Sequence, residues 1–341
     1  MKIRFISDLH AALNMTYEAT DFVEIMKSKT PADVTLIAGD MDADIEEAKN
    51  FLDTYFKDEK VIFIGGNHIT YHSNAKPFLE LLEDYKKEFN GKWKFLENDY
   101  IWLNDDIAVI GCIGWTDFLY GHQTKAQYIK EINTEKAYQE KNKFIDTGKV
   151  FGKGTEFDKG IQEVHFCGPS LPDDPAKEYD ELDMGNKDSY RGRRMKNALN
   201  CMNDYRYGYW RDEDGKITPM YPSYTHEMHK ESLKAIKRCY KEIIAKNPNA
   251  TIILMTHHPF TSKCESQKYK DDPLNAAFMS NHDNWLKQFK NIKYYHCGHV
   301  HNRFFNKLGH IQVICNPMGY LAWYEHIQET KFNINCILEV E

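Results

Sequence analysis

No stretch of the 341-residue sequence holds the roughly 18 consecutive apolar residues that a membrane-spanning helix needs. The apolar run in the first ten residues, MKIRFISDLH, is too short for a signal peptide, and Asp8 interrupts it. Internal repeats and low-complexity tracts are missing as well. We therefore expect a globular protein of the cytoplasm without a membrane partner, and the sequence does not determine its oligomeric state.

Cysteine pairs spaced as CxxC are also absent, although the chain has eight cysteines. Scattered cysteines in a chain of this length are typical of free buried thiols in a reducing compartment. Positive charge is in short supply, because 44 Lys and Arg face 51 Asp and Glu, which gives a net charge of -7. Proteins that grip a nucleic-acid backbone are more often basic, so nucleic acid stays open as a partner but is not favoured.

What the sequence does contain is a regular alternation of apolar segments. Strand-like runs at 2–7, 33–39 and 60–66 alternate with helix-like spacing at 16–29, 45–57 and 75–89. Further strands are expected at 100–104, 107–114, 250–256, 292–297, 310–316 and 333–341, and helices at 226–246 and 274–289. This alternation predicts βαβ units and a buried, largely parallel sheet.

The composition changes between residues 116 and 245, where segments such as SLPDDPAKEYDELDMGNKD are rich in Gly, Pro, Asp and Lys. Such a segment is typical of an elaborate insertion rather than of a second domain. Short helices are expected in it around 123–143 and 193–204. We expect one domain over residues 1–341, with an insertion at about 116–245.

Polar residues follow five of the expected strands, at the point where each strand ends. Because ligands of an open α/β sheet bind beyond the carboxyl ends of its strands, these residues are expected to converge. The five clusters are Asp8-Leu9-His10, Gly39-Asp40, Gly66-Asn67-His68, His257-His258-Pro259 and Gly298-His299-Val300-His301.

The donor types in these clusters indicate a metal site. Carboxylate, imidazole and amide oxygen suit borderline divalent cations such as Mn, Fe, Zn, Co or Ni. In extended backbone, Asp8 and His10 would project to one face, as would His299 and His301. Each motif alone is weak, since turns and structural histidines produce the same letters. Only their joint occurrence at strand ends predicts the site.

The motifs SDLH, AGDMDA, GGNHIT, MTHHPF and CGHVH resemble, in this order, those of the calcineurin-like metallophosphoesterase superfamily. The segments GWTDF and MNDYRYG resemble features of its bacterial and phage members. The resemblance covers about residues 1–115 and 250–341. It implies the α/β class and a four-layer αββα sandwich with a large mixed insertion. It also implies a dinuclear metal-dependent hydrolase of phosphate esters, either a phosphomonoesterase or a phosphodiesterase of small substrates.

The resemblance also implies roles for individual residues. Two divalent ions (Mn, Fe, Zn or Ni) would share Asp40 and hold a bridging hydroxide that attacks phosphorus in line, with His68 assisting the leaving group. The first ion would take Asp8, His10, Asp40 and His301, and the second Asp40, Asn67, His257 and His299. His258, Asn67 and Arg206 are candidate substrate contacts.

One position departs from the family, because Ile69 stands where a Glu or Asp usually follows Asn-His. A catalytically weak metal-binding scaffold protein is therefore one alternative, and a nuclease acting on DNA or RNA is another. A mononuclear zinc hydrolase fits less well, because such sites need about three protein ligands and this chain offers more. The favoured substrate is a small or nucleotide-like phosphate ester. Asp42 and Asp44 could support the metal ligands, but a role in a turn or as a helix cap is favoured.

Overall fold

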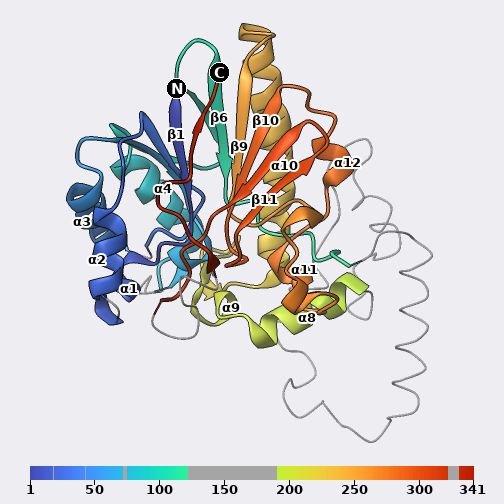
Figure 1. Ribbon diagram of the computed structural model, residues 1–341. Coiled ribbons are helices and arrows are strands. Elements are labelled where there is room, and N and C mark those ends of the chain that lie inside the picture. The colour runs from blue at the N-terminus through green and yellow to red at the C-terminus, as the bar shows by residue number, and fades with distance from the viewer. Residues whose placement is uncertain (18, 43, 72–74, 122–189, 322–329) are drawn as a thin grey trace, which may run out of the picture.

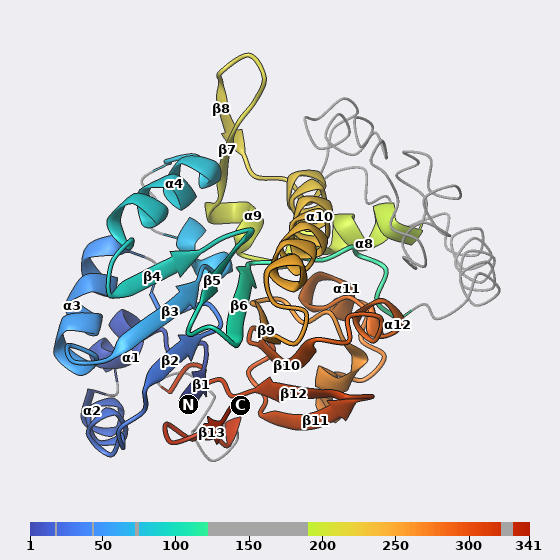
Figure 2. The ribbon, with the colours of Figure 1, turned by 90° about the horizontal axis from the view of Figure 1, so that it is seen from above.

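Two β-sheets lie face to face at the centre of the computed structural model, with helices on both outer sides (Figures 1 and 2). The structure describes residues 1–17, 19–42, 44–71, 75–121, 190–321 and 330–341. The expected helix around 123–143 lies outside the described residues.

The first sheet carries the amino-terminal half of the alternating pattern. Its strand order is β13-β1-β2-β3-β4, in which β1 to β4 are parallel and β13 pairs antiparallel with β1. Phe5, Leu36 and Ile62 are neighbours in register, so the carboxyl ends of their strands lie together. The strands are β1 (Lys2–Ile6), β2 (Val34–Ile37), β3 (Lys60–Ile64), β4 (Trp93–Leu96) and β13 (Ile337–Glu339).

The second sheet has the order β11-β12-β10-β9-β6-β5, with four parallel central strands and an antiparallel strand at each edge. Its strands are β5 (Asp99–Trp102), β6 (Ile107–Cys112), β9 (Thr251–Thr256), β10 (Ile292–Cys297), β11 (Phe304–Leu308) and β12 (Ile311–Cys315). Both β9 and β10 point their carboxyl ends toward the same edge, because they are parallel neighbours.

Helices complete the four layers. The first sheet is covered by α1 (Ala11–Tyr17), α2 (Ala19–Lys27), α3 (Ile45–Tyr55) and α4 (Phe78–Glu88), and the second by α10 (Pro222–Lys246) and α12 (Asp283–Leu286) (Figure 2). Phe5, Leu36, Ile253 and Met255 are buried between the sheets. Burial of each such side chain contributes about 1.5–3 kcal/mol to the free energy of folding. The predicted αββα sandwich is confirmed.

The described part of the insertion adds five elements, of which α10 packs Leu233, Ile236 and Ile243 into the core of the second sheet. The elements before it are α8 (Tyr190–Cys201), α9 (Asp204–Tyr207) and the hairpin of β7 (Tyr209–Arg211) and β8 (Ile217–Pro219). Among the described residues, no helix is both long enough and apolar enough to span a membrane.

Two expected helices differ from the structure. The helix expected at 16–29 begins earlier and is assigned as α1 and α2. The helix expected at 274–289 is divided into α11 (Asn275–Phe278) and α12. The backbone amides of Ser280 and His282 donate to the carbonyls of Pro259 and Phe260, so the chain between α11 and α12 bonds to the loop after β9 instead of continuing a helix.

Candidate metal centre

The loops that follow β1, β2, β3, β9 and β10 meet at one edge of the sandwich, below the carboxyl ends of these strands in Figure 1. Asp8 and His10 follow β1, and Asp40 follows β2. The short 3-10 turn η1 (Asn67–Thr70) follows β3 and begins with Asn67 and His68. His257 follows β9, and His299 and His301 follow β10. The convergence expected from the sequence is therefore present, and residues from both sheets contribute to it.

The backbone at this edge is not the extended conformation expected from the sequence. Asp8, His10, Asp40, His299 and His301 have φ between 41° and 68°, which is the left-handed region. This conformation is unusual for residues other than glycine and costs on the order of 1–3 kcal/mol each. The loops cross one another here, since the amides of Asp8 and His10 donate to the carbonyls of Gly39 and Asp40. Such strain is typical of functional sites.

Two glycines of the motifs permit this close approach. A Cβ atom on Gly66 would lie 2.0 Å from Oδ1 of Asp40, and one on Gly298 would lie 2.6 Å from Oδ2 of Asp8. Both distances are too short for any side chain. Glycine is therefore required here because the carboxylates of Asp8 and Asp40 pack directly on the neighbouring loops.

The first group of ligand atoms belongs to Asp8, His10 and His301, whose atoms lie within 4.8 Å of one another. Nε2 of His301 is 3.3 Å from Nε2 of His10 and 3.5 Å from Oδ1 of Asp8. The other carboxylate oxygen of Asp8 is buried and has no hydrogen-bond partner among the described residues. A cation would satisfy this oxygen.

The second group belongs to Asp40, His257 and His299, with Asn67 beside them. Nε2 of His257 is 3.1 Å from Oδ2 of Asp40 and 3.0 Å from Oδ1 of Asn67. Nε2 of His299 is buried and has no hydrogen-bond partner in the described structure. Asp40 also lies within ligand distance of His10, so its carboxylate stands between the two groups.

The protonation states suit cation binding. Burial holds the pKa of His10 and of His299 well below the usual value, so both rings keep free lone pairs. Burial alone would raise the pKa of Asp40, but His257 and His68 hold it well below its usual value. Burial likewise opposes charge on His257, yet Asp40 raises its pKa to about 9. A proton therefore competes with a cation for the Nε2 atom of His257.

Taken together, two buried atoms without partners and an oxygen and imidazole donor set fit divalent cations. Every residue expected as a ligand lies at this edge of the sheets. These residues are Asp8, His10, Asp40, Asn67, His257, His299 and His301.

His68 is not among the expected ligands, although one of its ring nitrogens lies within 4.8 Å of ligand atoms of His10 and Asp40. Its backbone amide donates to Oδ1 of Asp40, and its Nε2 is 4.0 Å from Oδ2 of the same carboxylate. The hydroxyl of Tyr320 lies 2.8 Å from this Nε2. Ile69, in the place of the family's acid, is buried in the hydrophobic core. Among the described residues, the nearest polar contact of the imidazole is thus a phenol and not a carboxylate.

Asp204 is a site residue that the sequence does not single out. Its Oδ1 accepts hydrogen bonds from Nδ2 of Asn67 at 2.6 Å and from the hydroxyl of Tyr71 at 3.1 Å. The bond to Nδ2 turns the carbonyl oxygen of Asn67 toward His257. Asp204 lies in the segment MNDYRYG, and its separation of 137 residues from Asn67 hides the contact in the sequence.

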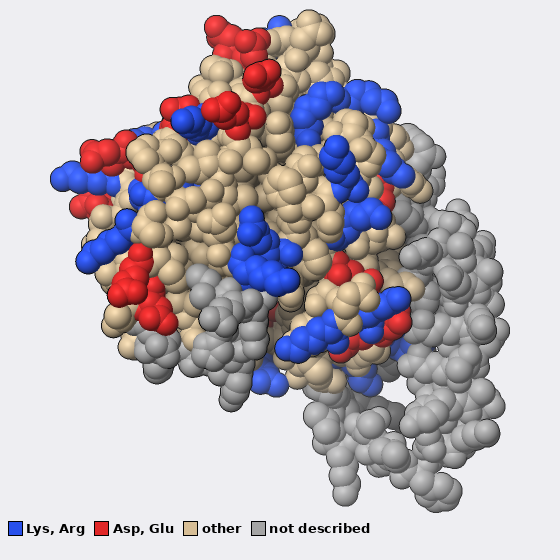
Figure 3. Space-filling model, viewed as in Figure 1, with Lys and Arg blue, Asp and Glu red and all other residues tan. Residues whose placement is uncertain are grey.

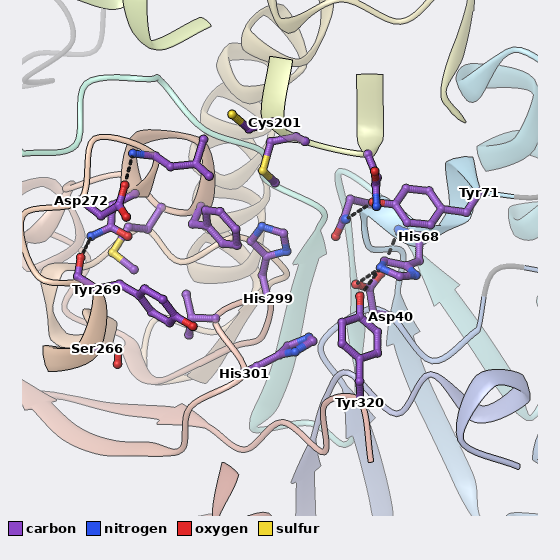
Figure 4. A pocket seen from close by; sticks show the side chains of 18 residues that line it. Asp40, His68, Tyr71, Cys201, Ser266, Tyr269, Asp272, His299, His301 and Tyr320 are labelled. Carbon is purple, nitrogen blue, oxygen red and sulfur yellow. Dashed lines mark hydrogen bonds and ion pairs between the residues drawn. The ribbon is translucent and has the colours of Figure 1, made fainter. Parts of the chain in front are cut away.

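A cavity of about 400 Å³ opens above the metal centre (Figure 4). Asp40, His68 and Tyr320 lie on one side of it, opposite His299 and His301. The rest of its wall contains the apolar or aromatic side chains of Met202, Tyr269, Leu274, Phe278 and Met279 and the polar side chains of Asn203, Ser266, Asp272 and Asn275.

Two expected substrate contacts are not brought to this cavity. His258 is 1% exposed and packs between the rings of Trp115 and His299. Arg206 is on the surface, where its Nη2 donates to the carbonyl of Asn200. Within the described residues, neither lines the wall. Asp44 caps α3, as expected, by accepting from the amides of Glu46 and Glu47.

Comparison with known proteins identifies the family. A family model described as calcineurin-like phosphoesterase matches residues 1–170. The chain belongs to the calcineurin-like phosphoesterase family, and the family expected from the motifs is confirmed. Members of this family bind divalent metals and hydrolyse phosphate esters, so the chain is a metallophosphoesterase.

Two solved structures are similar to this chain. Phosphopantetheinyl hydrolase from Mycobacterium tuberculosis is 14% identical with a TM-score of 0.52, covering 94% of this chain and 89% of that one. At this identity the likeness concerns the fold alone. A putative 5'-nucleotidase from Staphylococcus aureus, in complex with alpha-ketoglutarate, is 12% identical with a TM-score of 0.38 and covers 93% and 48%. The search of curated proteins finds no match.

Proposed function

We propose that the protein holds two divalent cations and hydrolyses a small phosphate ester, either a monoester or a small diester. The observation that carries this proposal is the pair of ligand groups on either side of Asp40. Such a cation pair, when bound, lowers the pKa of a water molecule and neutralises charge on phosphate oxygens. Mn, Fe, Zn and Ni all suit the donor set.

The chain's own residues have distinct tasks in this proposal. Asp40 lies within ligand distance of both groups, so its carboxylate would hold both cations. His68, beside Asp40 and half-buried at the cavity, is placed to give a proton to the leaving oxygen. Asn67 would contribute its amide oxygen to the second cation, and the hydrogen bond from its Nδ2 to Asp204 orients that oxygen.

The cavity favours a small substrate. Its volume of about 400 Å³ is in the range of small-molecule sites, and its wall combines apolar side chains with a few polar ones. On the face shown in Figure 3, basic residues gather at the upper right and elsewhere alternate with acidic ones, so no basic band runs across the whole face. A nucleic-acid partner would favour such a band. The single-domain organisation and the cytoplasmic location stay predictions from the sequence.

Removal of metal tests the proposal. Excess chelator is expected to reduce hydrolysis of an aryl phosphate or phosphodiester by on the order of 100-fold or more, and Mn²⁺ should restore it. Elemental analysis of the restored protein is expected to give at least two ions per chain. Full activity in chelator, or a single ion per fully active chain, would contradict the dinuclear proposal. A panel of nucleotides, phosphopeptides and single-stranded DNA distinguishes a small-substrate esterase from a nuclease.

Replacing Asp204 with alanine is expected to weaken binding of the second cation by about 10–100-fold, because Asn67 loses the contact that orients its amide. Calorimetric titration of the metal-free protein with Mn²⁺ measures this. Asp204→Asn keeps an acceptor oxygen and should retain part of the affinity. Asp214→Ala, in the exposed turn of the β7–β8 hairpin, is the control and should bind normally. Equal affinities of the Asp204→Ala and control variants would show that Asp204 does not position Asn67.

A further inference from the structure

A second cluster of metal-ligating side chains shares no residue with the metal centre. Asp117 belongs to the loop after β6, His229 to the first half of α10, and His282 to the residue that precedes α12. All three are buried, with at most 2% of each residue exposed. One ligand atom from each lies within 4.8 Å of the others. None of these residues has a task in the proposed hydrolysis.

The two imidazoles face each other through their Nε2 atoms, which are 3.0 Å apart. Nδ1 of His229 lies 2.7 Å from the carbonyl oxygen of Gly114 and must carry the hydrogen of that bond. The neutral ring therefore presents a lone pair at Nε2, and burial lowers the pKa of His229 to about 4. Oδ2 of Asp117 lies 3.8 Å from Nε2 of His282. Two lone pairs cannot face each other at 3.0 Å, so either the Nε2 hydrogen of His282 or a metal ion lies between the two Nε2 atoms.

We propose that Asp117, His229 and His282 bind a third divalent cation with a structural role. Ligands held at about 2.0–2.2 Å from one ion can be up to about 4.4 Å apart, and the two distances above satisfy this limit. Two imidazoles and one carboxylate suit a borderline cation such as Zn²⁺. The depth of the cluster separates it from substrate, so the ion would act on the fold and not on the reaction.

A cation here would connect three segments that are far apart in the sequence. The loop after β6 also contains Trp115, whose ring stacks on His258 at 4.8 Å, and His258 in turn packs on His299 at 4.1 Å. Asp117 is further fixed by its amide, which donates to Ser280, and by its carbonyl, which accepts from Arg191. The site would therefore support the packing behind one of the candidate ligands of the metal centre.

The alternative occupant is a proton. In that case Nε2 of His282 donates to Nε2 of His229, and the cluster is a hydrogen-bonded pair beside a carboxylate. Both states satisfy the same distances, but they differ in the number of metal ions per chain. The number of ions therefore decides between them.

The test is elemental analysis of protein loaded with Zn²⁺ and then freed of excess metal. His282→Gln is expected to contain about one ion fewer per chain than the wild type, while its hydrolysis of an aryl phosphate with Mn²⁺ stays within about threefold. His310→Gln, in the exposed turn between β11 and β12, is the matched control and should keep the wild-type content. Because the measured quantity is a difference of one ion, it holds whether the metal centre binds one cation or two.

Asp117→Asn provides a second variant if His282→Gln does not fold, and it should show the same loss of one ion. Chelation is also expected to lower the melting temperature of the wild type by more than that of a folded cluster variant. Equal metal content in the wild type and in either folded cluster variant overturns the proposal and assigns a proton to the cluster. A failed hydrolysis assay with the one-ion difference intact overturns the proposed enzymatic function instead.

Discussion

Asp40→Asn is expected to reduce kcat/KM for phosphate esters by about 10³-fold or more. The carboxylate lies between both ligand groups, with Oδ2 3.1 Å from Nε2 of His257 and Oδ1 accepting the amide of His68. A neutral amide has one oxygen and no charge to bridge two cations. A rate reduction of about 10³-fold corresponds to a loss of about 4 kcal/mol of transition-state stabilisation, because each 1.36 kcal/mol changes the rate tenfold.

The matched control for this variant is Asp44→Asn. Asp44 belongs to the same loop but caps α3, and asparagine is also a good helix cap. The control should keep wild-type kinetics. Elemental analysis of both variants shows whether a cation is lost, and steady-state kinetics shows whether the reaction is slower at unchanged metal content. Undiminished turnover in Asp40→Asn would refute the assignment of Asp40.

His68→Ala is expected to reduce hydrolysis of an alkyl phosphate by about 10²–10⁴-fold, the usual contribution of a general acid. The loss should be much smaller for an aryl phosphate with an acidic phenol, because that leaving group departs without a proton. His68 is placed for this task by its position at the cavity beside Asp40. The comparison of the two substrates reports on proton transfer and not on folding.

His310→Ala is the control for this experiment, because His310 is exposed and precedes the amino end of β12, at the opposite end of the parallel strands from the metal centre. It should leave both rates unchanged. Tyr320→Phe removes the hydroxyl that lies 2.8 Å from Nε2 of His68 and tests whether this phenol orients the ring. Equal losses of His68→Ala on alkyl and aryl substrates would exclude a role in leaving-group protonation.

The fold was predictable where local pattern and tertiary environment agree. The runs IRFI, VTLI and VIFI are buried on both faces, so their composition reflects the core of a parallel sheet. Polar residues directly after such strands have one edge to occupy, and for this reason Asp8, Asp40 and Asn67 could be grouped from their spacing alone.

The contacts that the sequence did not reveal depend on distant partners. The strands β4 and β11 were not expected from the sequence. Three residues of the edge strand β11 are exposed and β4 begins with two half-buried residues, so neither forms the apolar run that marks a buried strand. Asp204 reaches Asn67 from the insertion, and Tyr320 reaches His68 from 252 residues away. The left-handed backbone at Asp8 arises from the crossing of two loops, which the DxH spacing does not encode.

The origin of the candidate ligands in two separate sheets has a consequence for stability. Asp8, Asp40 and Asn67 belong to one half of the sandwich, while His257, His299 and His301 belong to the other. An ion held by both halves would bind only while the two sheets are packed together. Its binding free energy would therefore add to the stability of the packed state. Separation of the two sheets and release of the metal would then be coupled, so that each promotes the other.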